Sequence, residues 1–199
     1  MNLIHQETEG LLSPVLRDIR LRQVSFHIEE SSTILDMACV AGYLSRFLPV
    51  GCRYYGVDRV PASNTNEFTS FLHLDVLANG SFERIRDWLP QSPDYVTCIA
   101  FLEHIENPAE FVEKCSRLLA SNGKFIGTTP HPRGRIVHDL LSRVHLCSRQ
   151  GAEEHERFLG KEDIERIART SKGSLSRYSQ FLLSLNQLFV IEYPERREA

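Results

Sequence analysis

The feature that most constrains the fold of this chain is a repeated pair, a short apolar run followed at once by an aspartate. Ile34 and Leu35 precede Asp36, residues 54–57 precede Asp58, and residues 71–74 precede Asp75. Short apolar runs that alternate with helical patterns are typical of parallel strands buried on both faces. The repetition therefore predicts an α/β fold.

Helical periodicity lies between these runs, and two more runs follow, at residues 95–100 and 124–128. The two closing strands, at residues 174–180 and 187–193, have no helix between them, so we expect them to pair antiparallel. Together the pattern predicts a doubly wound, mostly parallel sheet of seven strands with helices on both faces. The expected helices cover residues 13–28, 42–49, 81–89, 107–119 and 161–170.

Length and composition exclude several classes of protein. A chain of 199 residues with 42% apolar and 25% charged residues fits one globular domain, 1–199, not a disordered or coiled-coil chain. Within it we expect an N-terminal helical segment, 1–30. No apolar run approaches the roughly 20 residues of a membrane span, so we expect no membrane partner. A net charge of −3 argues against nucleic acid as a partner. The oligomeric state stays open.

Cysteine usage and the start of the chain indicate the compartment. The five cysteines form no C-x-x-C pair, which disfavours a zinc cluster or a complete disulfide framework. The first ten residues lack the basic and apolar regions of a secretory signal. We therefore expect a cytoplasmic protein.

The three aspartates point to a ligand site. In an open parallel sheet the ligand binds beyond the carboxyl ends of the strands, so acids at successive strand ends face one crevice. A single aspartate there is more often a turn or helix cap. Three in series, with small residues after Asp36, favour a nucleoside-like ligand.

Five stretches then resemble class I S-adenosylmethionine-dependent methyltransferases of the small bacterial type. Ile-Leu-Asp-Met-Ala-Cys-Val-Ala-Gly at 34–42 resembles their first motif, acid-x-Gly-x-Gly-x-Gly. The other resemblances lie at 56–58, 74–76, 93–105 (which contains Leu-Glu-His) and 118–125, in the order of the family. The resemblance covers about residues 30–193 and implies a Rossmann-like methyltransferase fold. A nicotinamide dinucleotide site fits less well, since only Gly42 is available for its glycine fingerprint.

The resemblance implies a role for each matching position toward the cofactor S-adenosyl-L-methionine. Asp36 and the loop with Ala38, Val40 and Gly42 would hold the methionine part. Asp58 would accept the ribose hydroxyls, because a carboxylate offers two acceptor oxygens to a diol. Asp75 and Val76 would contact the adenine. Ala100 and Phe101 would line the place where the methyl group meets its acceptor.

The first motif departs from the family pattern where glycine is expected. Ala38 is a mild change, but a β-branched residue such as Val40 is a genuine outlier at positive φ and costs on the order of 1–3 kcal/mol. Three interpretations stay open: strain, a displaced loop whose valine fills part of the pocket, and ordinary backbone angles. The short stretch 60–70 also leaves little room for a helix between the second and third strands.

Candidate catalytic residues follow the fourth and fifth strands. His104 and His131 are the candidates for a base, which matters only if the acceptor is a hydroxyl or a protonated amine. Residues 131–160 form the expected acceptor-side lid; its basic residues either hold an anionic acceptor or form the solvated side of an amphipathic helix. Its histidines have no metal-ligand spacing, so we predict no metal site. Cys39 is expected to pack in the core, not to act as a nucleophile.

The sequence therefore predicts a methyltransferase acting on a small-molecule or glycan-type acceptor. The alternative is a catalytically impaired methyltransferase-like protein that acts as a binding or scaffold module, and Val40 is the residue that favours it. A third possibility is an enzyme that uses another nucleoside ligand. The acceptor, and the atom that is methylated, stay open.

Overall fold

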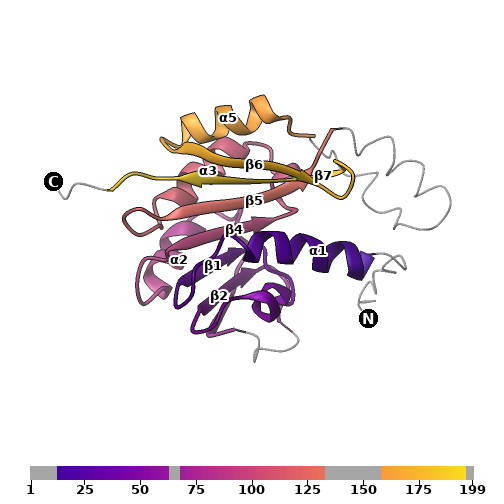
Figure 1. Ribbon diagram of the computed structural model, residues 1–199. Coiled ribbons are helices and arrows are strands. Elements are labelled where there is room, and N and C mark those ends of the chain that lie inside the picture. Colours follow the sequence, from indigo (N-terminus) through magenta and orange to yellow (C-terminus); the bar gives the residue numbers. More distant parts are fainter. Residues whose placement is uncertain (1–12, 63–67, 133–157, 196–199) are drawn as a thin grey trace, which may run out of the picture.

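The computed structural model describes residues 13–62, 68–132 and 158–195 (Figure 1). In these ranges helices and strands alternate as the sequence predicts. The helices are α1 (Ser13–Ser25), α2 (Ser81–Trp88), α3 (Pro108–Ser116) and α5 (Lys161–Thr170), with two 3₁₀ helices, η1 (Tyr43–Phe47) and η3 (Leu102–His104). The strands are β1 (Thr33–Met37), β2 (Arg53–Asp58), β3 (Ser70–His73), β4 (Tyr95–Ile99), β5 (Lys124–Pro130), β6 (Ser174–Phe181) and β7 (Asn186–Glu192).

All these strands form one sheet of seven strands in the order β3-β2-β1-β4-β5-β7-β6. Strands β1 to β5 pair parallel, and β7 pairs antiparallel with both β5 and β6. The predicted fold class and the antiparallel closing pair are therefore confirmed. The strand order reverses between β1 and β4, so the ligand crevice of such a sheet lies beyond their carboxyl ends.

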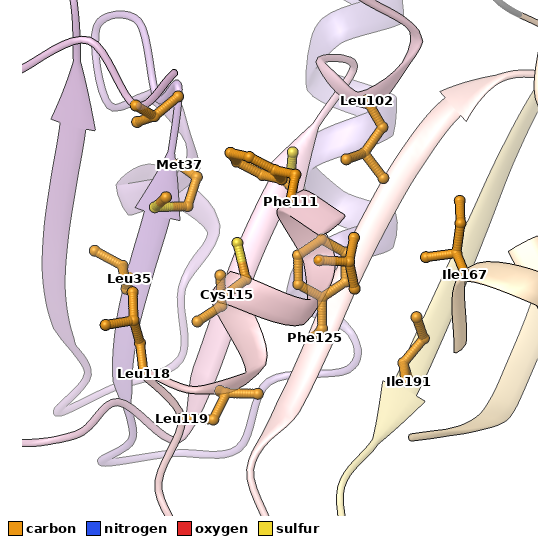
Figure 2. Packing of buried hydrophobic residues seen from close by; sticks show 14 of the residues in the cluster. Leu35, Met37, Leu102, Phe111, Cys115, Leu118, Leu119, Phe125, Ile167 and Ile191 are labelled. Carbon is orange, nitrogen blue, oxygen red and sulfur yellow. The ribbon is translucent and has the colours of Figure 1, made fainter. Parts of the chain in front are cut away.

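Helices cover both faces of the sheet. On one face α1 packs its buried Leu21 and Val24 against Ile34 of β1 and Ile126 of β5. On the other face α2, α3 and α5 cover a larger apolar cluster. Figure 2 shows part of it, with Leu35 and Met37 of β1 and Phe125 of β5 beside Phe111 and Cys115 of α3. Alternate residues of β1 thus point to opposite faces, as period-two geometry requires.

Local capping fixes the ends of the helices. The Asn107 side chain accepts the Glu110 N–H at 3.3 Å and Pro108 occupies the first turn, which starts α3 as the sequence predicts. At the start of α5 the Asp163 carboxylate accepts the Gly160 N–H at 2.9 Å. These caps satisfy backbone groups that a helix end leaves without partners.

Three predicted boundaries are wrong, each for a local reason. The first helix ends at Ser25, because the chain tightens into i→i−3 bonds at His27 and Ile28. The helical stretch after Gly42 is only the 3₁₀ helix η1, since left-handed Gly42 and Pro49 leave room for a single short turn. The third strand ends at His73, because the chain turns at Asp75.

No helix in the described ranges combines the length and the apolar character that crossing a membrane requires. Cys39, Cys52, Cys98 and Cys115 are free thiols, and Cys147 lies outside the described residues.

Gly127 tests the packing of the larger cluster. Its missing Cβ leaves space for the ring of Phe189, which is fully buried and stacks on Phe125 at 6.2 Å. We expect Gly127→Ala to lower the free energy of unfolding by about 1–3 kcal/mol, because the added methyl overpacks the core. Urea denaturation measures this. In a Phe189→Leu background the same change should cost less; an equal cost in both backgrounds would contradict the assignment.

Candidate active site

Asp36 occupies the centre of the sheet and binds both neighbouring strands. Its carboxylate accepts the hydroxyl of Tyr54 from β2 and, at 2.7 Å, the hydroxyl of Thr97 from β4. Burial raises its pKa to about 6, against the lowering effect of the two hydrogen bonds. Asp36 lies inside β1, which ends one residue later at Met37, so it is not itself a strand end.

The loop after β1 has the backbone of a glycine motif without most of its glycines. Ala38, Val40 and Gly42 have φ values of 57°, 53° and 71°, which are the left-handed angles that favour glycine. The interpretation that Val40 has ordinary angles is therefore wrong, and the strained conformation is present. The Val40 side chain is 60% exposed.

Asp58 at the end of β2 ties this loop to the sheet. Its Oδ2 accepts the Val40 N–H and its Oδ1 accepts the Val60 N–H, both at 2.7 Å. The side chain is only 6% exposed. Each carboxylate oxygen has a second lone pair, so the two bonds leave acceptor capacity for a ligand hydroxyl. Asp58 thus lies where the sequence predicts and also stabilises the strained loop.

Phe68 packs against the same loop, and sequence analysis missed it. A Cβ on Gly42 or on Gly56 would overlap its ring, which also stacks on Tyr54 at a centroid distance of 5.2 Å. The described part of the β2–β3 connection, residues 59–62 and 68–69, contains no helix. Phe68 therefore covers this side of the loop and of β2. The glycines at 42 and 56 are a sequence signal for a close neighbour, but they do not identify it.

Asp75 differs from Asp36 and Asp58 in its exposure to solvent, and Val76 follows it in the chain. Asp75 is exposed and its carboxylate accepts the Leu77 N–H at 2.9 Å, as in a capped turn, whereas Val76 is buried. Val76 lines a groove of about 420 Å³ that lies between α2 and α3 and extends past the end of α3 to Arg117. Of the two residues predicted to contact adenine, Val76 lines this groove and Asp75 does not.

Ala100 and Phe101 follow β4, at the reversal point of the sheet. Ala100 has a φ of 52°, and its N–H donates to the carbonyl of Thr128 on β5 at 2.9 Å. Phe101 is half-buried, with its ring 6.0 Å from that of Phe111. His104, at the end of η3, is exposed. Left-handed residues thus follow both β1 and β4, the two strands that flank the crevice.

Arg20 of α1 is a second residue that sequence analysis missed. Its Nη2 donates to Oδ1 of Asn186 at 3.1 Å, and Asn186 pairs with Pro130 at the end of β5. Burial lowers the pKa of the guanidinium, while the nearby Glu103 carboxylate raises it. Within the described ranges its buried Nε has no hydrogen-bond partner. Arg20 therefore brings an unused donor to the carboxyl ends of the strands.

His131 lies directly after β5 and is half-buried. Its backbone N–H donates to the carbonyl of Leu185 at 2.9 Å, and its Nε2 lies 3.0 Å from Nε2 of Gln180 on β6. The basic residues of the predicted lid, Arg133 to Arg157, lie outside the described residues. In the described ranges no group of histidine, cysteine and acidic side chains has the arrangement of a metal site.

Cys39, in the loop, is buried and packs beside Gly56. Burial raises the pKa of its thiol well above the ordinary range, and the carboxylates of Asp36 and Asp58 raise it further. A thiol held protonated is a poor nucleophile, which agrees with the expected packing role.

Comparison with known proteins decides the family. A family model described as a methyltransferase domain matches residues 9–171. The chain belongs to the methyltransferase domain family. S-adenosyl-L-methionine is the methyl donor of such enzymes, so the predicted family, enzyme class and cofactor are confirmed.

Individual relatives are distant. A ubiquinone biosynthesis O-methyltransferase from Idiomarina loihiensis is 25% identical over 177 residues, which cover 81% of this chain and 71% of the relative. One of the same name from Nitrosomonas europaea is 23% identical over 151 residues, 70% of this chain and 62% of that protein. A solved Burkholderia thailandensis 1,6-didemethyltoxoflavin-N1-methyltransferase with bound S-adenosylhomocysteine matches with a TM-score of 0.64 at 12% identity, over 91% of this chain and 81% of the other.

Asp36 should make the stability of the protein depend on pH. Its pKa is raised in the folded state, so its contribution is full below the unfolded value of 3.8 and is lost as the pH rises through about 6. Compared with Asp36→Asn, which cannot ionise, the wild type should lose about 2 kcal/mol of unfolding free energy between pH 4 and pH 7. Urea denaturation across this range measures the difference. Parallel pH profiles would contradict the buried, ionisable carboxyl.

Val40→Gly should stabilise the protein. Glycine removes the β-branched side chain from a left-handed backbone, which outweighs the entropy that glycine loses on folding, so we expect a gain of about 1 kcal/mol in unfolding free energy. Val60→Gly is the matched control, because Val60 is also exposed but is not among the residues with positive φ. It should be destabilising. A loss of stability in both variants would show that the loop is not strained at Val40.

Proposed function

We propose that this chain transfers a methyl group from S-adenosyl-L-methionine to an oxygen atom of a small-molecule acceptor. The observation that carries the proposal is the left-handed loop after β1, held by Asp58 at the reversal point of the sheet. The choice of oxygen rests on the O-methyltransferase names of the sequence relatives.

The residues around this loop fit the proposed cofactor. Left-handed backbone at 38, 40 and 42 forms a cradle that a ligand can approach closely, and Asp58 keeps acceptor capacity for the two ribose hydroxyls. The unused Nε donor of Arg20 suits an anionic group, such as the carboxylate of the methionine part. Asp75 and the Val76 backbone would bind the adenine, beside the groove between α2 and α3.

The residues around the site would promote the reaction mainly by holding the methyl group and the acceptor in line. The cofactor, when bound, supplies a methyl group on a sulfonium: the acceptor oxygen bonds to the methyl carbon in line as the carbon–sulfur bond breaks and the thioether leaves. Ala100 and Phe101 would line this point, because Ala100 is fixed to β5 through Thr128 and Phe101 is packed on Phe111. A reacting pair held in line gains rate from orientation and from exclusion of water. His131, three residues beyond Thr128 on β5, would contact the acceptor.

The names of the relatives support the size class of the proposed acceptor. Both relatives named above are enzymes of ubiquinone biosynthesis, and the chain covers 71% and 62% of their lengths. We propose a small organic acceptor with a hydroxyl group; a glycan-type precursor is the other acceptor consistent with the predicted basic lid. His104 stays a predicted site residue, and cytoplasmic localisation stays part of the proposal.

One observation favours a second function, a binding or scaffold module without methyl transfer. Val40 adds a side chain at the position where the loop of an active family member has glycine, and that side chain points away from the core with 60% exposure. If the Val40 side chain occupies the position of the cofactor, the protein keeps its fold but does not bind S-adenosyl-L-methionine. Its removal in Val40→Gly distinguishes an impaired site from an absent one.

Calorimetric titration with S-adenosylhomocysteine tests the proposal. We expect the wild type to bind, and Asp58→Ala to bind at least 10-fold more weakly, because hydrogen bonds to a charged group contribute about 1.5–3 kcal/mol. Asp87→Ala, which removes an exposed aspartate from α2, is the control and should bind like the wild type. Thermal unfolding confirms that each variant is folded.

The outcomes separate the two functions. Binding that is lost in Asp58→Ala supports the enzyme and justifies a screen of hydroxylated acceptors. No heat from folded wild type or from Val40→Gly would overturn the proposal and favour the scaffold module.

A further inference from the structure

A row of hydrogen-bonded side chains connects the buried centre of β7 to His131. Gln187 is fully buried, and its Nε2 donates to the Thr129 hydroxyl at 2.8 Å and to the carbonyls of Leu159 and Pro130 at 2.5 and 3.3 Å. The Tyr178 hydroxyl lies 2.8 Å from Oε1 of Gln187. Gln180 continues the row, with its Nε2 3.2 Å from the Tyr178 oxygen and 3.0 Å from Nε2 of His131. We call Gln187, Tyr178 and Gln180 the β6–β7 relay.

The direction of the relay follows from its buried end. A backbone carbonyl only accepts hydrogen bonds, so the two carbonyls fix the amide of Gln187 with its NH₂ group toward them. Its Oε1 then faces Tyr178 and accepts the hydrogen bond that the phenolic hydroxyl donates. The Tyr178 oxygen is left with lone pairs toward Gln180, which must present its own NH₂ group.

The same NH₂ group faces the imidazole of His131. A group that donates to Nε2 requires a lone pair there, so Nε2 carries no proton and the neutral ring is protonated at Nδ1. The opposite orientation of Gln180 would place its oxygen against the Tyr178 oxygen, whose proton is already donated to Gln187. Two facing acceptors lose a hydrogen bond and repel, so the relay selects one orientation.

We propose that the β6–β7 relay holds His131 as the Nδ1–H tautomer, and that His131 therefore binds the acceptor instead of removing its proton. The lone pair of the neutral ring lies on Nε2 and accepts from Gln180, so taking a proton from the acceptor would break that hydrogen bond, whereas the protonated Nδ1 donates. Tyr178, Gln180 and Gln187 are positioning residues, because they act through His131. The part of the inference that concerns the acceptor rests on the proposed methyltransferase function, whereas the tautomer does not.

Nitrogen-15 NMR of the full-length protein tests the tautomer without cofactor or acceptor. Long-range ¹⁵N–¹H spectra at pH 8 distinguish protonated from unprotonated ring nitrogens, and His131→Gln assigns the signal among the eight histidines. We expect an unprotonated Nε2 and a protonated Nδ1. A protonated Nε2 in the wild type would overturn the proposal, whatever the outcome of cofactor binding.

Gln180→Glu reverses the polarity of the relay at an exposed position. Its carboxylate accepts where the amide donated, so we expect the Nε2 of His131 to become protonated. Tyr178→Phe removes the link to Gln187 and should give a mixture of both tautomers. Gln91→Glu is the matched control, because Gln91 donates to Thr33 at the start of β1, and it should leave the His131 signals unchanged. An unchanged tautomer in Gln180→Glu would contradict the relay.

Kinetics of His131→Gln test the role toward the acceptor once an acceptor is found. A binding residue should raise the KM of the acceptor and leave kcat within about threefold, since its loss affects ground state and transition state alike. A fall in kcat of about 10²- to 10⁴-fold, as expected for the loss of a general base, would overturn this part.

Discussion

The buried carboxylate of Asp36 links the three central strands of the sheet. It lies between the two strands that pair with β1 and accepts a hydroxyl from each, Tyr54 on β2 and Thr97 on β4. These bonds fix the three central strands at the level where the loop after β1 begins. Burial of this carboxyl disfavours its charged form, which raises its pKa and lowers the stability of the fold when it ionises. Asp36 thus fixes the positions of the strands whose carboxyl ends border the predicted ligand crevice.

Above this carboxylate, the protein keeps a glycine-type loop with few glycines. Alanine and valine keep a left-handed backbone conformation only where the surrounding contacts hold the chain in place. Here Asp58 binds the N–H of Val40, and the ring of Phe68 packs on Gly42 and Gly56, where no Cβ interferes. The remaining glycines therefore lie where an aromatic ring approaches the backbone. This division explains how the fold of a methyltransferase survives the loss of its first two motif glycines.

The antiparallel hairpin of β6 and β7 contributes more than an edge to the sheet. Through Asn186 it holds Arg20 of α1, and through Gln187 it holds the end of β5 and the carbonyl of Leu159 before α5. Residues from the first helix and the last strand thus meet at the carboxyl ends of the parallel strands. In the proposed function, this place is the acceptor side of the site.

Periodicity and motif order are local properties of the chain, so the amino-acid sequence was enough to predict the alternation of elements, the parallel sheet, the antiparallel closing pair and the family. It also placed Asp58 at the end of the second strand and singled out Val40, but it left strain, a displaced loop and ordinary backbone angles open. It did not find Phe68, Arg20 or Gln187, and it placed Asp36 and Asp75 at strand ends. These positions and contacts required the folded chain, since partners such as Arg20 and Asn186 are separated by 166 positions along the sequence. Which hydrogen bonds a buried side chain makes depends on what packing brings beside it, and no short pattern records that.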